Sequence, residues 1–249
     1  MKHGTAFLLL AVLLAIVGIG SIAAYLAYRP GSPTMVPMEK EESETAQAIR
    51  YLPLGDSYTI GQSVSETERW PNQLAARLAA KDIRLNIVAN PAVTGYTTQD
   101  LIDRELPLVA RLQPEFVTIA IGVNDYVQGV SAAQFAANLD YIIATVQKQL
   151  PRPGAIVLVT IPDFGVTPAG SRFGSPQDIA AGIEKFNAII KQRAAHYQLP
   201  VADVYDISKQ AANDPALTAP DGLHPSAKAY AQWTDIIFNT IITTGVFDR

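Results

Sequence analysis

The sequence of 249 residues contains no cysteine and only three histidines. The lack of cysteine excludes disulfides, thiolate zinc sites, a cysteine nucleophile and a lipid-modified N-terminal cysteine. It leaves the cellular compartment open, because a chain without thiols tolerates both reducing and oxidising surroundings. Any chemistry that needs an imidazole therefore has few candidate positions.

An excess of charge of one sign is also missing. The formal net charge is −4, and charged residues make up 17% of the chain. Such a surface has no general attraction for nucleic acid or for anionic lipid, so we expect no nucleic-acid partner. Apolar residues make up 49% of the chain. A chain of this length and composition can bury the core of one ordinary domain.

The N-terminal segment has no charged residue between positions 4 and 28 and consists mostly of Leu, Ile, Val, Ala and Phe. About 20 such residues span a bilayer as a helix. The run is longer than the core of a usual signal peptide, which favours an uncleaved membrane anchor over residues 1–29, with the rest of the chain outside the cytoplasm. The alternative is a cleaved signal peptide, with Ser21 and Ala23 near the cut. A helix of the domain core is disfavoured, because the run has no polar face.

Residues 30–48 have a different composition. They contain three prolines and four glutamates and few residues that could offset the entropy of ordering. We interpret this segment as a flexible linker, extended by proline at one end and by charge at the other. The linker predicts a domain over residues 49–249 that is tethered to the membrane, or released if the leader is cleaved.

Residues 49–249 alternate short β-branched runs with amphipathic stretches, and no internal repeat is visible. The runs expected to be buried strands are Ile49–Leu54, Leu85–Ala89, Phe116–Ile121, Ala155–Ile161 and Val201–Val204. The expected helices are Pro71–Lys81, Thr98–Leu112, Ser131–Leu150, Pro176–Tyr197 and Ser226–Thr243. This alternation predicts an α/β fold with a parallel sheet and helices on both faces. In such sheets ligands bind beyond the carboxyl ends of the strands.

Ser57 follows the first expected strand, within the sequence Gly55-Asp56-Ser57-Tyr58. A turn between strand and helix would raise the serine at the top of the sheet, but a serine needs a nearby base to act as a nucleophile. The alternative is that Asp56 and Ser57 are simple turn or cap residues.

His224 is the histidine best placed to be that base. Asp221 lies three residues before it, so the carboxylate can accept from one ring nitrogen and leave the other facing a serine. His3 precedes the apolar run, and His196 ends a long expected helix, where a surface position is expected. A loop histidine satisfied by its own contacts is the alternative for His224.

Two further residues follow expected strands. Gly95 lies after the second and Asn124 after the third. The Gly95 N–H and the Asn124 amide could stabilise an oxyanion, and a glycine allows close approach of the backbone. The alternatives are a turn glycine and a helix cap. The loop that begins at residues 161–165 either lines the pocket or is a plain connection.

These blocks, in this order, resemble the GDSL or SGNH hydrolase family over nearly all of residues 49–249. The Ser, Gly, Asn and His of the family's successive blocks match Ser57, Gly95, Asn124 and His224, and its aspartate matches Asp221. The resemblance implies a three-layer α/β/α sandwich with a five-stranded parallel sheet, of flavodoxin-like type. It also implies ester hydrolysis through an acyl-serine intermediate, without metal or cofactor. In that scheme Ser57 attacks, His224 takes the proton and Asp221 holds the imidazolium, while the N–H groups of Ser57 and Gly95 and the Asn124 amide form the oxyanion hole.

The expected substrates are esters of small molecules, lipids or acylated glycans. A carbohydrate O-deacetylase or acyltransferase of the cell envelope is an alternative within the same fold. A binding module that keeps the fold without activity is an alternative of another class. The sequence leaves acyl length, alcohol and oligomeric state open.

Overall fold

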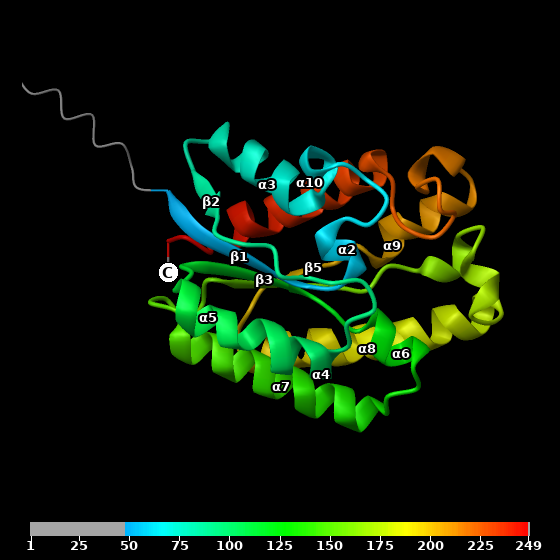
Figure 1. The fold of residues 1–249 in the computed structure, drawn as a ribbon, viewed down its shortest axis with the longest axis horizontal. Helices are drawn as coiled ribbons and strands as arrows, with labels where there is room; N and C mark the ends of the chain where they lie inside the picture. The colour runs from blue at the N-terminus through cyan, green and yellow to red at the C-terminus, as the bar shows by residue number, and fades with distance from the viewer. Residues whose placement is uncertain (1–47, 249) are drawn as a thin grey trace, which may run out of the picture. The chain divides into compact units, whose positions relative to one another are not determined.

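The computed structural model describes residues 48–248, so the predicted anchor and nearly all of the predicted linker lie outside the described residues. Five parallel strands form one sheet in the order β2-β1-β3-β4-β5 (Figure 1). The strands are β1 (Ile49–Gly55), β2 (Leu85–Ile87), β3 (Phe116–Ala120), β4 (Ile156–Val159) and β5 (Val201–Ala202). The α/β fold with a five-stranded parallel sheet is therefore confirmed.

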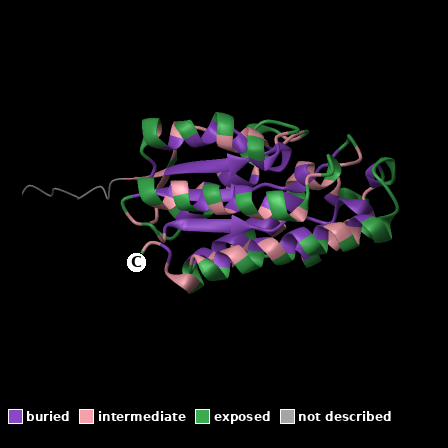
Figure 2. Ribbon diagram, turned by 90° about the horizontal axis from the view of Figure 1, so that it is seen from below, coloured by how far each residue is buried: buried purple, intermediate pink, exposed green. Residues whose placement is uncertain are grey.

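Strand β1 lies inside the sheet, between β2 and β3, and this position accounts for the hydrophobic sequence of the strand. Tyr51 pairs with Ile87 of β2 on one side and with Phe116 of β3 on the other. Residues 51–55 of β1 and all of β3 and β4 are buried, because helices cover both faces of the sheet (Figure 2). Because β1 and β3 are parallel neighbours, their carboxyl ends meet at the same edge of the sheet.

Two helical layers enclose the sheet. Helices α3 (Trp70–Ala79) and α10 (Ala227–Thr244) pack together on one face, whereas α5 (Leu106–Leu112), α7 (Ala132–Gln149) and α8 (Pro176–His196) cover the other (Figure 1). The three layers of the predicted sandwich are confirmed. The shorter helices are α2 (Ser57–Ile60), α4 (Thr98–Asp100), α6 (Val123–Val127) and α9 (Tyr205–Ser208). Short 3₁₀ segments are η1 (Glu66–Glu68), η3 (Phe164–Val166), η4 (Gly170–Arg172), η5 (Lys209–Ala212) and η6 (Pro215–Leu217).

One expected helix is not continuous. The chain from residue 98 to 112 forms α4, then the π-helical turn η2 (Leu101–Glu105), then α5. Pro107 stands in the first turn of α5 and has no N–H to continue the α-helical ladder from the preceding turn. A widened turn before it accommodates this loss. Helix α7 begins as expected, since the Ser131 hydroxyl accepts the Gln134 N–H.

Strands β4 and β5 are shorter than expected, and so is β2 at the other edge of the sheet. The ladder between β4 and β5 consists of two pairs, Leu158 with Val201 and Val159 with Ala202. Beyond them Asp203 uses its side chain to accept from Thr160 Oγ1 at 2.9 Å, so side-chain contacts replace backbone pairing. Apolar runs predict burial at these positions but not where a ladder stops.

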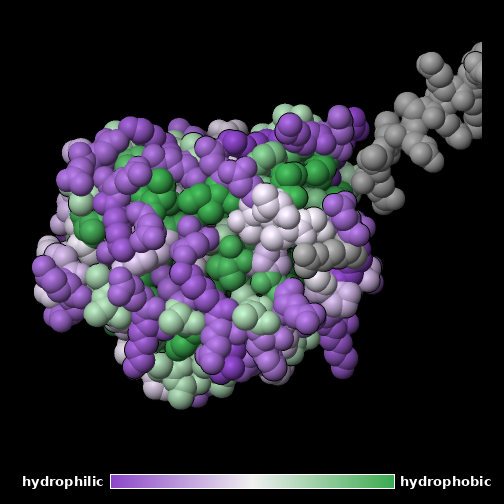
Figure 3. All heavy atoms as spheres, turned by 180° about the vertical axis from the view of Figure 1, so that it is seen from behind, coloured by the Kyte–Doolittle hydropathy of each residue, from purple (hydrophilic) through white to green (hydrophobic). Residues whose placement is uncertain are grey.

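The surface of the described chain has the mixture of polar and apolar side chains that is usual for a folded protein. Figure 3 shows one face, on which hydrophilic side chains surround smaller groups of apolar ones. Within residues 48–248 no helix combines the length and the apolar character needed to cross a membrane.

Candidate active site

Ser57 stands at the carboxyl end of β1, where the chain turns sharply into α2. A Cβ on Gly55 would lie 2.4 Å from the Ala120 carbonyl oxygen, so only glycine allows β1 and β3 to approach this closely. Asp56 caps α2 by accepting the Tyr58 N–H at 3.0 Å. Ser57 is the first residue of α2, so its backbone N–H has no acceptor within the helix.

His224 is held from two sides. Its Nδ1 lies 2.7 Å from Asp221 Oδ2, and the ring packs edge-on against Tyr58 with 5.7 Å between ring centroids. The residue is 6% exposed. Asp221 Oδ1 accepts the backbone N–H groups of Leu223 and His224, both at 2.9 Å. With Nδ1 engaged by the carboxylate, Nε2 is the ring nitrogen left to take part in chemistry.

The Asp221 carboxylate is strongly stabilised in its charged form. Burial alone would raise its pKa, but hydrogen bonds oppose this and hold the pKa of Asp221 well below its usual range. The donors are the Ser63 hydroxyl, the two backbone N–H groups and the His224 ring. Asp221 is therefore an anion at any pH near neutrality, as a partner for an imidazolium must be.

Gly95 lies on the loop that follows β2, and Asn124 lies in α6, which follows β3; both line the same hollow as His224. Gly95 has φ +88°, a left-handed conformation that favours glycine, although a Cβ there would meet open space. Asn124 Nδ2 donates to the Tyr96 carbonyl at 2.9 Å, and Gln128 Nε2 donates to the Gly95 carbonyl at 3.3 Å. These bonds fix the Gly95 turn to α6 and leave the second Asn124 amide proton for a ligand.

A buried polar cluster stands behind Asn124. Asp125 accepts from both the backbone N–H of Thr98, at 2.8 Å, and the Thr98 hydroxyl. Asn138 of α7 also donates to that hydroxyl, at 2.9 Å. Asp125 and Thr98 are fully buried. Burial raises the pKa of Asp125, against the effect of its bonds to Thr98. The cluster joins α4, which follows the Gly95 turn, to α6, which carries Asn124.

The predicted residues converge on one hollow of about 280 Å³. Ser57, Gly95, Asn124 and His224 all line it, and Asp221 stands behind His224. Within residues 48–248, the Ser57 hydroxyl and the Gly95 N–H have no hydrogen-bond partner. The remaining lining residues are Tyr58, Gln62, Thr94, Val123, Val127, Phe164, Phe173 and Leu223. His196 is exposed at the end of α8, as expected, and is not part of this lining.

Comparison with known proteins agrees with this geometry. Residues 54–232 match the model of the GDSL-like lipase/acylhydrolase family. The chain belongs to this family. It is therefore a carboxylic ester hydrolase, as the sequence predicted.

Relatives of known structure share the fold. The chain is 26% identical over 184 residues to thioesterase 1/protease 1/lysophospholipase L1 of Escherichia coli K12, covering 74% of this chain and 79% of that protein. It superposes on the crystal structure of TesA with a TM-score of 0.61 and 22% identity, over 77% and 97% of the two chains. For Axe2, an acetylxylan esterase from Geobacillus stearothermophilus, the TM-score is 0.62 and the identity 20%, over 78% and 94%.

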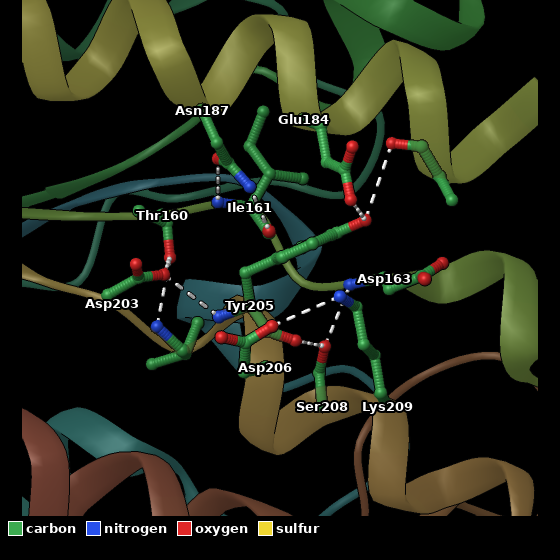
Figure 4. Close-up of polar contacts among 12 residues, drawn as sticks. Thr160, Ile161, Asp163, Glu184, Asn187, Asp203, Tyr205, Asp206, Ser208 and Lys209 are labelled. Carbon is green, nitrogen blue, oxygen red and sulfur yellow. Dashed lines mark hydrogen bonds and ion pairs between the residues drawn. The ribbon is translucent and has the colours of Figure 1, made fainter.

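The loop after β4 lines the hollow in this member of the family. Asn187 of α8 fixes it by bonding both the N–H and the carbonyl of Ile161, each at 2.8 Å (Figure 4). The Asp163 N–H donates to Ser208 Oγ at 2.8 Å, and the Asp163 carboxylate caps η3. Phe164, which follows, contacts the Phe173 ring edge-on at 5.6 Å between centroids. The loop is thus part of the pocket and more than a connection.

Three residues around the site were not predicted from the sequence. Ser63 donates to Asp221, Tyr58 packs on His224, and Asp125 supports the loop beside Asn124. Tyr58 and Asp125 are direct neighbours of predicted residues, so their place in the same motifs was an available signal. Ser63 gave none, because its partner is 158 residues away.

Proposed function

We propose that the protein hydrolyses esters by forming an acyl intermediate on Ser57. Ser57 Oγ attacks the ester carbonyl while His224 Nε2 takes its proton, and the resulting imidazolium is stabilised by Asp221. The protonated His224 then gives its proton to the departing alcohol, and a water repeats the sequence to release the acid. The N–H groups of Ser57 and Gly95 and the Asn124 amide stabilise the oxyanion. The contact of 2.7 Å between His224 and Asp221, in a hollow shared with Ser57, carries this proposal.

The apolar part of the lining favours an ester with a hydrophobic acyl group. Val127 and Phe173 are 40% and 44% exposed, and Phe164 and Leu223 continue the apolar surface beside them. Burying a methylene group against such a surface contributes about 0.8 kcal/mol. A lysophospholipase is among the relatives, which supports a lipid ester as substrate.

Polar residues in the lining of the same hollow favour an O-deacetylase as the second candidate. Gln62 and Thr94 are hydrogen-bonded to one another there, and such side chains can receive sugar hydroxyls. An acetylxylan esterase is among the proteins of similar fold, which supports the same alternative.

A membrane anchor in residues 1–29 would hold the enzyme near either substrate. The uncharged run from residue 4 to 28 supports an anchor with the domain outside the cytoplasm, and a cleaved signal peptide is the alternative. Washing membranes with carbonate should leave the full-length chain attached. A released chain that begins near Ala24 would instead establish cleavage.

The decisive experiment on activity compares the wild type with Ser57→Ala. The wild type should be labelled by a fluorophosphonate and should hydrolyse aryl esters, whereas the variant should do neither. Aryl esters of increasing acyl length, run beside acetylated sugars and lysophospholipid, separate the two substrate candidates. Full activity in Ser57→Ala would overturn the assignment of the nucleophile, and a wild type without labelling or activity would favour the binding module.

A further inference from the structure

Ser63 makes an unexpected contact with the carboxylate that holds the imidazole. Its hydroxyl donates to Asp221 Oδ2 at 2.6 Å, and this is the oxygen that lies 2.7 Å from His224 Nδ1. The other oxygen, Oδ1, accepts the two backbone N–H groups of Leu223 and His224. Both oxygens are therefore engaged, and the carboxylate cannot rotate without breaking at least two hydrogen bonds.

The Ser63 backbone holds an unfavourable conformation at this point. Its φ is +69°, in the left-handed region, where a side chain other than glycine costs about 1–2 kcal/mol. Ser63 is exposed, so its hydroxyl could equally bond to water in a relaxed conformation. Strain of this kind persists where surrounding structure imposes it, and it concentrates at functional sites.

Ser63 also belongs to the segment that presents Ser57. Helix α2 ends at Ile60, Gly61 caps it, and the Gln62 N–H returns to the Ser57 carbonyl at 3.0 Å. The segment that begins with Ser57 thus reaches Asp221 through the Ser63 hydroxyl, and Asp221 lies in a loop near the other end of the chain. One short segment connects the serine with the partner of the histidine.

We infer that Ser63 is a positioning residue, whose hydroxyl fixes the Asp221 carboxylate so that Oδ2 faces His224 Nδ1. The inference rests on the proposed function, in which Asp221 stabilises the imidazolium. The bond to Ser63 also contributes most among the hydrogen bonds that keep the pKa of Asp221 low against its burial. Without the hydroxyl, water would enter at the exposed face of Asp221, and the orientation of the imidazole would be less well defined.

Two substitutions at this position should move stability and turnover in different directions. Ser63→Gly removes the hydroxyl and the strain together, so turnover should fall roughly tenfold while the melting temperature stays equal or rises. Ser63→Thr keeps the hydroxyl but adds a β-branch in a left-handed conformation, so turnover should be retained at a lower melting temperature. KM for a short aryl ester should stay unchanged in both variants, because Ser63 does not line the hollow.

Gln113→Gly is the matched control. Gln113 has φ +46° at the end of α5, so its replacement relieves the same strain away from the hollow and should leave turnover unchanged. Wild-type turnover in Ser63→Gly, or equal loss in Ser63→Gly and Ser63→Thr, would overturn the inference. If Ser57→Ala is inactive and Ser63→Gly is fully active, only the role of Ser63 fails. Activity in Ser57→Ala would instead remove the proposed function on which it depends.

Discussion

The two sides of the hollow are held in different ways. On the amide side, which comprises Gly95 and Asn124, the support comes from Asp125 and Thr98, both fully buried. On the imidazole side, which comprises Asp221 and His224, the Asp221 side chain is 27% exposed and its partner Ser63 lies at the surface.

Because of this difference, substitutions on the two sides should have different effects on the stability of the fold and on turnover. Removing a buried hydrogen-bond partner leaves polar groups unsatisfied and costs about 1–3 kcal/mol for each. Removing an exposed partner lets water replace it, so the fold changes little and only the orientation of the reacting group suffers. Substitutions on the amide side should therefore affect folding and turnover together, whereas substitution of the exposed Ser63 on the imidazole side should affect mainly turnover.

The largest effect on turnover is expected at His224. His224→Ala removes the proposed base, and turnover should fall by roughly 10⁴-fold or more. His196→Ala is the matched control, because His196 is exposed at the end of α8. Initial rates with an aryl ester measure both. A larger loss in His196→Ala than in His224→Ala would show that His196, and not His224, is the base.

Asn124→Ala should have the next largest effect. Loss of one oxyanion donor lowers turnover by about 10²–10³-fold, while substrate binding changes far less. The amide also holds the Tyr96 carbonyl, so a lower melting temperature should accompany the loss. Measuring kcat and KM separately checks this prediction. A raised KM with normal kcat would make Asn124 a substrate contact instead.

Much of this site could be predicted because its signals are local. Ser57, Gly95 and Asn124 each follow an apolar run, and parallel strands bring such positions to one edge of the sheet. Asp221 and His224 are three residues apart, so their contact needs no knowledge of the rest of the fold.

The contacts that hold these residues could not be predicted, because they join distant parts of the chain. Ser63 meets Asp221 across 158 positions, and the left-handed backbone of a serine has no sequence signal. The break in the helix around residues 101–105 was not predicted, because the apolar periodicity continues through it. Pro107 was the one sequence signal for this break. The short helices α2, α6 and α9 have only four or five residues each, too few for the apolar periodicity of a helix to be recognised.

Asp125→Ala tests the amide side for its effect on stability. The substitution leaves the Thr98 N–H without its acceptor and the Thr98 hydroxyl with one partner fewer, so the free energy of unfolding should fall by about 2–4 kcal/mol. Turnover should fall as well, since the neighbouring Asn124 loses its support. Urea denaturation of Asp125→Ala and Ser63→Ala, measured in parallel, compares the two sides. Equal stability of these two variants would contradict the proposed difference between them.

The last effect concerns Asp56, the residue that caps α2 before Ser57, and it depends on pH. Burial raises the pKa of Asp56 to about 7, despite the bond from the Tyr58 N–H and with a further increase from the charge of Asp125. Because the folded pKa exceeds the unfolded value of about 3.9, Asp56 stabilises the fold below pH 4, and this contribution is lost as the pH rises to 7. Asp56→Asn keeps an oxygen for the Tyr58 N–H but cannot ionise. Its free energy of unfolding relative to the wild type should therefore increase by on the order of 3 kcal/mol between pH 4 and 7. Urea denaturation at several pH values measures this difference, and a difference that does not vary with pH would show that Asp56 is ionised in the folded protein throughout this range.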